Sequence, residues 1–152
     1  MELKERLQAD MKAALKARES GKKRLWVLRM ALSAIKNAEI AKRVCLDDAG
    51  VVEVLAAEMR SRRDTAAEFR RLGREDAAVE ADGEAVILSE YLPPPLSEGE
   101  LRDMVDAAVA ETGAAVLRDL GKVMGKLMPQ VKGLADGTLV QKMVRERLEK
   151  GN

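Results

Sequence analysis

The sequence contains no histidine, one cysteine and only three aromatic residues, Trp26, Phe69 and Tyr91. Without histidine, catalytic triads of the Ser-His-Asp and Cys-His types and histidine-ligated metal sites are excluded. The lone Cys45 cannot form an intrachain disulfide, and between two aliphatic neighbours we expect it to be a small buried residue. Catalysis would have to use carboxylates, lysine, arginine, hydroxyl groups or backbone amides. We therefore identify no catalytic residue, and we expect no metal and no cofactor.

Long hydrophobic runs are also missing, because no stretch approaches the roughly 20 apolar residues that a membrane span needs. Hydrophobic residues make up 47% of the chain and charged residues 35%, which is typical of a soluble globular protein. The N-terminal segment alternates charges and has no apolar region of the signal-peptide type. These absences lead us to expect a cytoplasmic protein that does not bind a membrane.

The residues that are abundant favour helices. Ala, Leu, Met, Glu, Lys and Arg dominate, and apolar residues recur every three or four positions. This pattern predicts an all-α fold. We expect Gly73 and Gly113 to end the third and fifth helices, and Pro129 to stop the sixth. The expected helices cover approximately residues 3–20, 22–43, 51–72, 76–91, 97–112, 115–128 and 137–150.

The run Pro93-Pro94-Pro95 is the clearest break in the chain, because it cannot continue a helix. Ser97 follows, and with Glu100 three residues later it forms a capping-box pattern. We predict an N-terminal four-helix domain (1–92), a proline-rich linker (93–96) and a C-terminal three-helix domain (97–152).

Charge is distributed unevenly although the formal net charge is only +1. Residues 1–45 hold 12 basic and 5 acidic residues, residues 46–100 hold 6 and 14, and residues 101–152 hold 9 and 7. The acidic middle could dock a basic protein partner, but its carboxylates show no recognisable metal-ligand spacing. On the third helix, spacings such as Glu58–Arg62 and Arg60–Asp64 predict ion pairs within the helix.

Four basic residues recur every seven positions on the second helix, at Lys22, Arg29, Lys36 and Arg43. Trp26 lies near this row and could stack on a nucleic-acid base. We favour a solvated basic rim, with Trp26 packed against a neighbouring helix.

The segment from Leu117 to Gly137 is the most informative. Treated as one helix, it has an apolar face and an opposite face made of glycine and basic residues. Glycine inside a helix costs roughly 1 kcal/mol relative to alanine, so something should approach Gly121 and Gly125 closely. That neighbour is either another helix of the protein, which we favour on general grounds, or an external ligand. The candidate phosphate-contacting set is Arg118, Gly121, Lys122, Gly125, Lys126, Lys132, Gly133, Lys142 and Arg145.

A resemblance to a known family runs through three stretches, VLRMALSAIKNAEI, RRDTAAEFRRLGREDAAVEADGEAVILSEYLP and GKVMGKLMPQVKGLADGTLV. They resemble the YqeY family of small bacterial proteins, which is similar to the C-terminal tail of GatB, the B subunit of the tRNA-dependent amidotransferase. The resemblance implies a two-part helical fold and a tail that helps to engage the tRNA body. The linker departs from the family pattern, where a single proline is more common. The match to the tail is best at Gly121, Met124, Gly125, Met128, Lys132, Gly133, Ala135 and Leu139.

Three functions follow as hypotheses. The first is a non-catalytic helical adaptor that associates with tRNA or other RNA and with amidotransferase or aminoacyl-tRNA synthetase components. The second, implied by the kinship alone, is participation in glutamine-dependent tRNA amidation, a carbon–nitrogen ligase activity with glutamine as amide donor. The third is a protein–protein interaction module built on the acidic middle of the chain.

Overall fold

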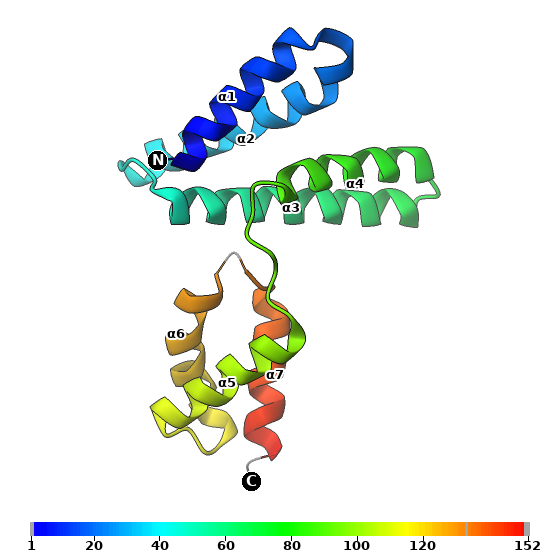
Figure 1. Ribbon diagram of the computed structural model, residues 1–152. Coiled ribbons are helices and arrows are strands. Elements are labelled where there is room, and N and C mark those ends of the chain that lie inside the picture. The colour runs from blue at the N-terminus through cyan, green and yellow to red at the C-terminus, as the bar shows by residue number, and fades with distance from the viewer. Residues whose placement is uncertain (1, 133, 151–152) are drawn as a thin grey trace. The chain divides into compact units, whose positions relative to one another are not determined.

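The computed structural model describes residues 2–132 and 134–150, and across them the protein consists of helices without a β-strand. The all-α prediction is confirmed (Figure 1). Two short 3₁₀ helices, η1 (Arg18–Gly21) and η2 (Leu117–Asp119), precede α2 and α6. The α-helices are α1 (Glu2–Lys16), α2 (Lys22–Lys42), α3 (Asp48–Arg71), α4 (Glu75–Ser89), α5 (Glu98–Thr112), α6 (Leu120–Val131) and α7 (Gly137–Lys150).

The chain divides into two compact units, Met1–Pro93 and Pro94–Asn152. Helices α1 to α4 belong to the first unit, and α5 to α7 belong to the second. Each unit has its own hydrophobic core, because the amphipathic helices bury their apolar faces locally. The first core includes Leu7, Leu28, Ile35, Val51 and Leu55. The second includes Leu101, Val105, Val123, Leu127, Val131, Val140, Val144 and Leu148.

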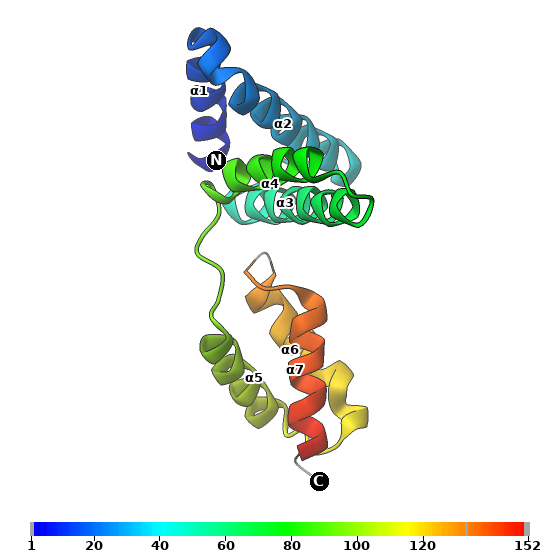
Figure 2. The ribbon, with the colours of Figure 1, turned by 90° about the vertical axis from the view of Figure 1, so that its right-hand side faces the viewer.

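In the first unit, α3 and α4 lie side by side in both views (Figures 1 and 2). Small side chains make this close pairing possible, because Ala66, Ala78 and Ala81 are buried between the helices. Gly83 does not interrupt α4. A Cβ added there would lie 2.3 Å from the Lys23 amine, so the glycine leaves room for that side chain of α2.

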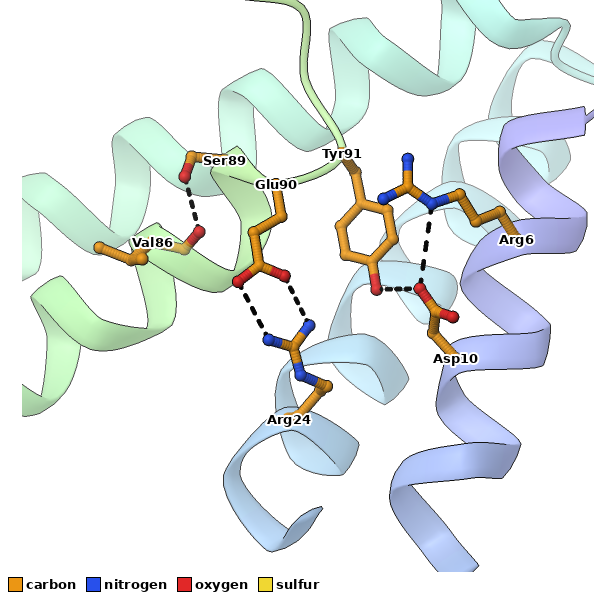
Figure 3. Close-up of polar contacts among 7 residues, drawn as sticks. All are labelled: Arg6, Asp10, Arg24, Val86, Ser89, Glu90 and Tyr91. Atoms are coloured by element: carbon orange, nitrogen blue, oxygen red, sulfur yellow. Dashed lines mark hydrogen bonds and ion pairs between the residues drawn. The ribbon is translucent and has the colours of Figure 1, made fainter. Parts of the chain in front are cut away.

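A polar cluster holds the end of the first unit where the chain enters the linker. The buried Tyr91 hydroxyl donates a 2.6 Å hydrogen bond to the Asp10 carboxylate, and the Arg6 guanidinium lies over the Tyr91 ring, 4.7 Å from its centre (Figure 3). Arg24 donates two hydrogen bonds, of 2.8 and 3.0 Å, to the carboxylate of Glu90. Side chains of α1 and α2 thereby fix the two residues that follow α4.

In the second unit, Ser97 caps α5 by accepting a 3.1 Å hydrogen bond from the Glu100 amide, as its sequence pattern predicts. Gly113 ends α5 with a positive φ of 68°. Asp136 caps the start of α7 by accepting a 3.0 Å bond from the Thr138 amide. The linker residues 93–96 form no regular structure, and the Leu96 amide donates a 3.1 Å bond to the Leu134 carbonyl within this unit.

The expected sixth helix, 115–128 with a stop at Pro129, is wrong at both ends. Its first part is the separate 3₁₀ helix η2, and α6 continues through Pro129 to Val131. The helix continues past the proline because Val131 is fully buried in the core. The Lys132 amide still donates a 2.9 Å hydrogen bond to the Met128 carbonyl.

Three further expectations for the first unit are wrong, and a fourth holds only in part. The first helix ends at Lys16, four residues early, and η1 leads into α2. Cys45 is exposed rather than buried, in the loop between α2 and α3. The expectation for Trp26 holds in part, because this residue lies beside residues of α3 and α4 but keeps 48% of its surface exposed. Arg62 pairs with Glu84 of α4 at 3.5 Å instead of with a residue of its own helix.

Candidate nucleic-acid interface

Helix α6 has one buried face and one exposed face. Val123, Leu127 and Val131 are fully buried in the core of the second unit. At about 100° per residue, the opposite face contains the candidate residues of this helix together with Pro129. These candidate residues are exposed, and they are Gly121, Lys122, Gly125 and Lys126.

The two glycines of α6 face open space. A Cβ placed on Gly121 or Gly125 would meet nothing within 4 Å in the described parts of the chain. Neither glycine has a positive φ, so the backbone does not require glycine there either. The interpretation that the glycines allow close packing of another helix of this protein is therefore wrong.

The lysines of this face are held only weakly by other residues of the protein. The Lys126 amine lies 3.3 Å from the Glu111 carboxylate of α5, and both side chains are at least half exposed. Such an exposed pair contributes about 0–1 kcal/mol, so a phosphate can replace the carboxylate at little loss. Lys122 is exposed one turn before Lys126, on the same side of the helix.

Asp119 organises the entry into α6. Its carboxylate accepts hydrogen bonds from the amides of Ala115 and Val116, at 3.0 and 3.3 Å. These two bonds, followed by the positive charges of Lys122 and Arg118, lower the pKa of Asp119 below its ordinary value. The Asp119 carboxylate, although it is close to the candidate lysines in sequence, therefore serves to hold the backbone that leads into α6.

The remaining candidate residues lie beyond α6. Arg118 belongs to η2, so its expected angular position on one continuous helix is wrong. Lys132 is the residue that follows α6, and Gly133 lies outside the described residues. Lys142 and Arg145 are exposed on α7, and Lys142 points away from the buried Val140 and Val144 by helical phase. Of the candidate set, the four residues of α6 share one exposed helix face.

Sequence reasoning missed Pro129 and Glu111 as parts of this surface. A proline favours the end of a helix, but the position of Pro129 eight residues after Gly121 places it on the same exposed face once the helix continues. No local signal could have pointed to Glu111, because its contact with Lys126 joins two helices.

The acidic residues of α4, considered above for a metal or a basic partner, are largely paired inside the first unit. The Arg24 hydrogen bonds are the main cause that lowers the pKa of Glu90. Within the described residues, no group of three or more acidic or cysteine side chains is placed to hold a metal ion. Four acidic residues of α4, and Glu90 directly after it, form ion pairs: Lys23–Glu80 at 3.5 Å, Arg62–Glu84 at 3.5 Å, Arg70–Glu75 at 3.3 Å, Arg70–Asp82 at 2.7 Å and Arg24–Glu90 at 2.8 Å.

Comparison with known proteins identifies the family. The family model described as "Yqey-like protein" matches residues 4–148, which is nearly the whole chain. The chain belongs to the YqeY family. A curated relative is altered inheritance of mitochondria protein 41, mitochondrial, of Saccharomyces cerevisiae strain YJM789. It is 29% identical over 128 residues, which cover 80% of this chain and 68% of the yeast protein, and the protein of strain S288c matches to the same extent.

The YqeY match spans both units and includes all of α6. The relative's name refers to mitochondria, so a cytoplasmic location for this chain stays a prediction. In the part of the chain that the structure describes, no helix combines the length and the apolar character needed to cross a bilayer.

Proposed function

We propose that this YqeY-family protein is a non-catalytic, RNA-associating helical adaptor, and that the exposed face of α6 contacts the phosphate backbone of tRNA or a similar RNA. The relation to the tail of the amidotransferase B subunit, and association with amidotransferase or synthetase components, belong to this proposal. So does a location in the cytoplasm, which a fluorescent fusion viewed in cells would test.

The observation that carries the proposal is the pair of open glycines on α6. Each glycine lowers helix stability by roughly 0.5–1 kcal/mol relative to alanine, and no described residue packs against the space where its Cβ would be. A ligand that must come close to the helix backbone gives them a role. A phosphate chain fits, because Lys122 and Lys126 lie beside the glycines and both side chains are exposed.

The charge of the surrounding segment supports the same ligand class. From residue 117 to residue 152 the chain has 8 basic and 4 acidic residues. The proposed contacts are Arg118, Lys122, Lys126, Lys132, Lys142 and Arg145, with Gly121, Gly125 and Gly133 allowing close approach. Those on α6 form the centre of the contact, and the others extend it.

Fluorescence anisotropy with labelled tRNA at low salt tests the proposal. We expect saturable binding that weakens with salt, and the slope of log K against log salt should fall by roughly 0.7–0.9 for each lysine contact removed. The variant Lys122→Glu with Lys126→Glu should lose most of the affinity. The control variant, Arg60→Glu with Arg63→Glu, makes the same charge change on the exposed surface of α3 in the first unit. This variant should retain the tRNA affinity of the natural protein. Absence of tRNA binding, or equal binding by both variants, would overturn the proposal.

A further inference from the structure

Helix α2 carries a second apolar face that the rest of the described chain covers only in part. Its buried face packs into the first core through Val27, Leu28, Ala31 and Ile35. On the other side, Trp26 is 48% exposed, Met30 44% and Ile40 66%. A helix that buries one apolar face and exposes another has an unused surface for a partner.

The spacing of this exposed face is that of a helix-pairing seam. Its residues alternate steps of four and three, which is the spacing of the a and d positions of a heptad. All lie within α2, and the two in the middle are small and polar. We name as the α2 seam the residues Trp26, Met30, Ser33, Asn37 and Ile40.

One side of the α2 seam is lined by a row of basic residues. Lys22, Arg29 and Lys36 each lie at the heptad position next to the seam, and all three are exposed. Within residues 2–132 and 134–150, none of the three forms an ion pair. Lys36 also lines the groove between α1 and α2 together with Lys12 and the Lys4–Glu39 ion pair, so this groove has a net positive charge. The charges of the basic row are therefore available to a partner, unlike those of Lys4, Lys23, Arg24 and Arg62, which pair with acidic residues of this unit.

The opposite side of the α2 seam is small and partly acidic. Ala34 and Ala41 occupy the equivalent heptad positions there, which lets another helix approach closely. A shallow pocket lies at the N-terminal end, where Trp26 and Met30 meet Glu58 of α3 and the Arg62–Glu84 pair. This hollow is too small to receive a side chain, so a partner helix would pack across its rim, beside the tryptophan.

We propose that the α2 seam binds an amphipathic helix of a protein partner, whose apolar residues pack along the seam and whose aspartates or glutamates pair with Lys22, Arg29 and Lys36. Charged residues at the positions that flank a seam set the choice of partner and its orientation. Asn37 would favour one register, since a single polar residue in a seam selects its alignment. This interface lies in the first unit and does not depend on the RNA-binding proposal.

Other occupants fit the surface less well. In an antiparallel pair of two copies of this chain, the basic row would face itself and repel. In a parallel pair, the basic row of one copy would face Ala34 and Ala41 of the other, which offer no acidic partner. RNA would leave Met30 and Ile40 exposed, because only the tryptophan offers a surface for stacking. An anionic membrane would meet the carboxylates of Glu58 and Glu84 beside Trp26.

Trp26 makes the interface directly measurable, because it is the only tryptophan of the chain. The probe is a synthetic helix of about three heptads with leucine at a and d, glutamate at e and g, and no aromatic residue. The matched probe carries lysine in place of glutamate. We expect the glutamate peptide to bind saturably and to shift Trp26 emission to shorter wavelength, and the lysine peptide to leave the emission unchanged.

Charge reversal on the protein should reverse this preference. In Arg29→Glu with Lys36→Glu, affinity for the glutamate peptide should fall by about tenfold and the lysine peptide should begin to bind. The variant Arg60→Glu with Arg63→Glu changes the charge equally on α3 and should keep the original preference. Circular dichroism and the melting temperature would verify that each variant is folded, which is expected because the substituted side chains are exposed.

Several results would overturn the proposal. Equal binding of both peptides, or no emission shift with either, would show that the basic row selects no acidic helix. Sedimentation that shows self-association with burial of Trp26 would assign the seam to a second copy. An emission shift with phosphatidylserine vesicles or with poly(U), and none with the glutamate peptide, would assign it to a membrane or to RNA.

Discussion

Tyr91 links the end of α4 to the first helix of the chain. Burial is the main cause that raises the pKa of its phenol to about 12, and the hydrogen bond to Asp10 adds to the rise. The ordinary value is 10.0, so the folded protein favours the protonated phenol. Below pH 10 the stability linked to this group is fully present, and it is lost as the pH rises toward about 12.

Absorbance at 295 nm tests this account, because Tyr91 is the only tyrosine of the chain. We expect its ionisation at about pH 12 in the folded protein and near pH 10 after unfolding in guanidinium. Tyr91→Phe should lower the free energy of unfolding at pH 7 by about 1 kcal/mol, because it removes one hydrogen bond and leaves the ring packed. A folded-state titration near pH 10 would contradict this description of the site.

Single residues also show what local sequence cannot reveal. Cys45 has two aliphatic neighbours in sequence, which suggested burial, yet only Leu46 turns into the core. Trp26 is exposed because the opposite face of α2 supplies the core. In both cases the sequence identifies an apolar residue, and tertiary packing decides whether that residue is buried.

At the scale of elements, α5 depends on its N-terminal cap. Ser97 accepts a hydrogen bond from the Glu100 amide and donates one, of 3.0 Å, to the Glu100 carboxylate. Ser97→Ala should destabilise the second unit by about 1 kcal/mol, whereas Ser97→Asp should retain most of the stability. Thermal unfolding followed by circular dichroism measures both variants. Equal melting of Ser97→Ala and the natural protein would show that the cap contributes nothing.

The boundaries of α5 and α7 were predictable because the capping and terminating residues Ser97, Gly113 and Asp136 are local sequence signals. Those of α6 were not. Its true start depends on Asp119 binding two amides, and its end depends on the burial of Val131 after a proline. The glycine–lysine face was visible from helical periodicity, but whether another helix covers it could be learned only from the structure.

At the scale of the whole molecule, two separate cores imply two unfolding events. Trp26 lies in the first unit, so its fluorescence follows that unit, whereas circular dichroism follows all helices. We expect the two signals to give different transitions in guanidinium. Ser97→Ala should shift only the transition that Trp26 does not report. One coincident transition for both signals would contradict independent units.

The central claim is that α6 keeps exposed glycines because RNA approaches its backbone. The most direct measurement compares stability and tRNA affinity in Gly125→Ala, with Gly99→Ala on α5 as the control. At either site an added Cβ meets no atom of residues 2–132 and 134–150 within 4 Å. Both variants should be as stable as the natural protein or more so, by up to about 1 kcal/mol at Gly125. We predict weaker tRNA binding for Gly125→Ala alone. Unchanged tRNA binding by the more stable Gly125→Ala protein would contradict the account.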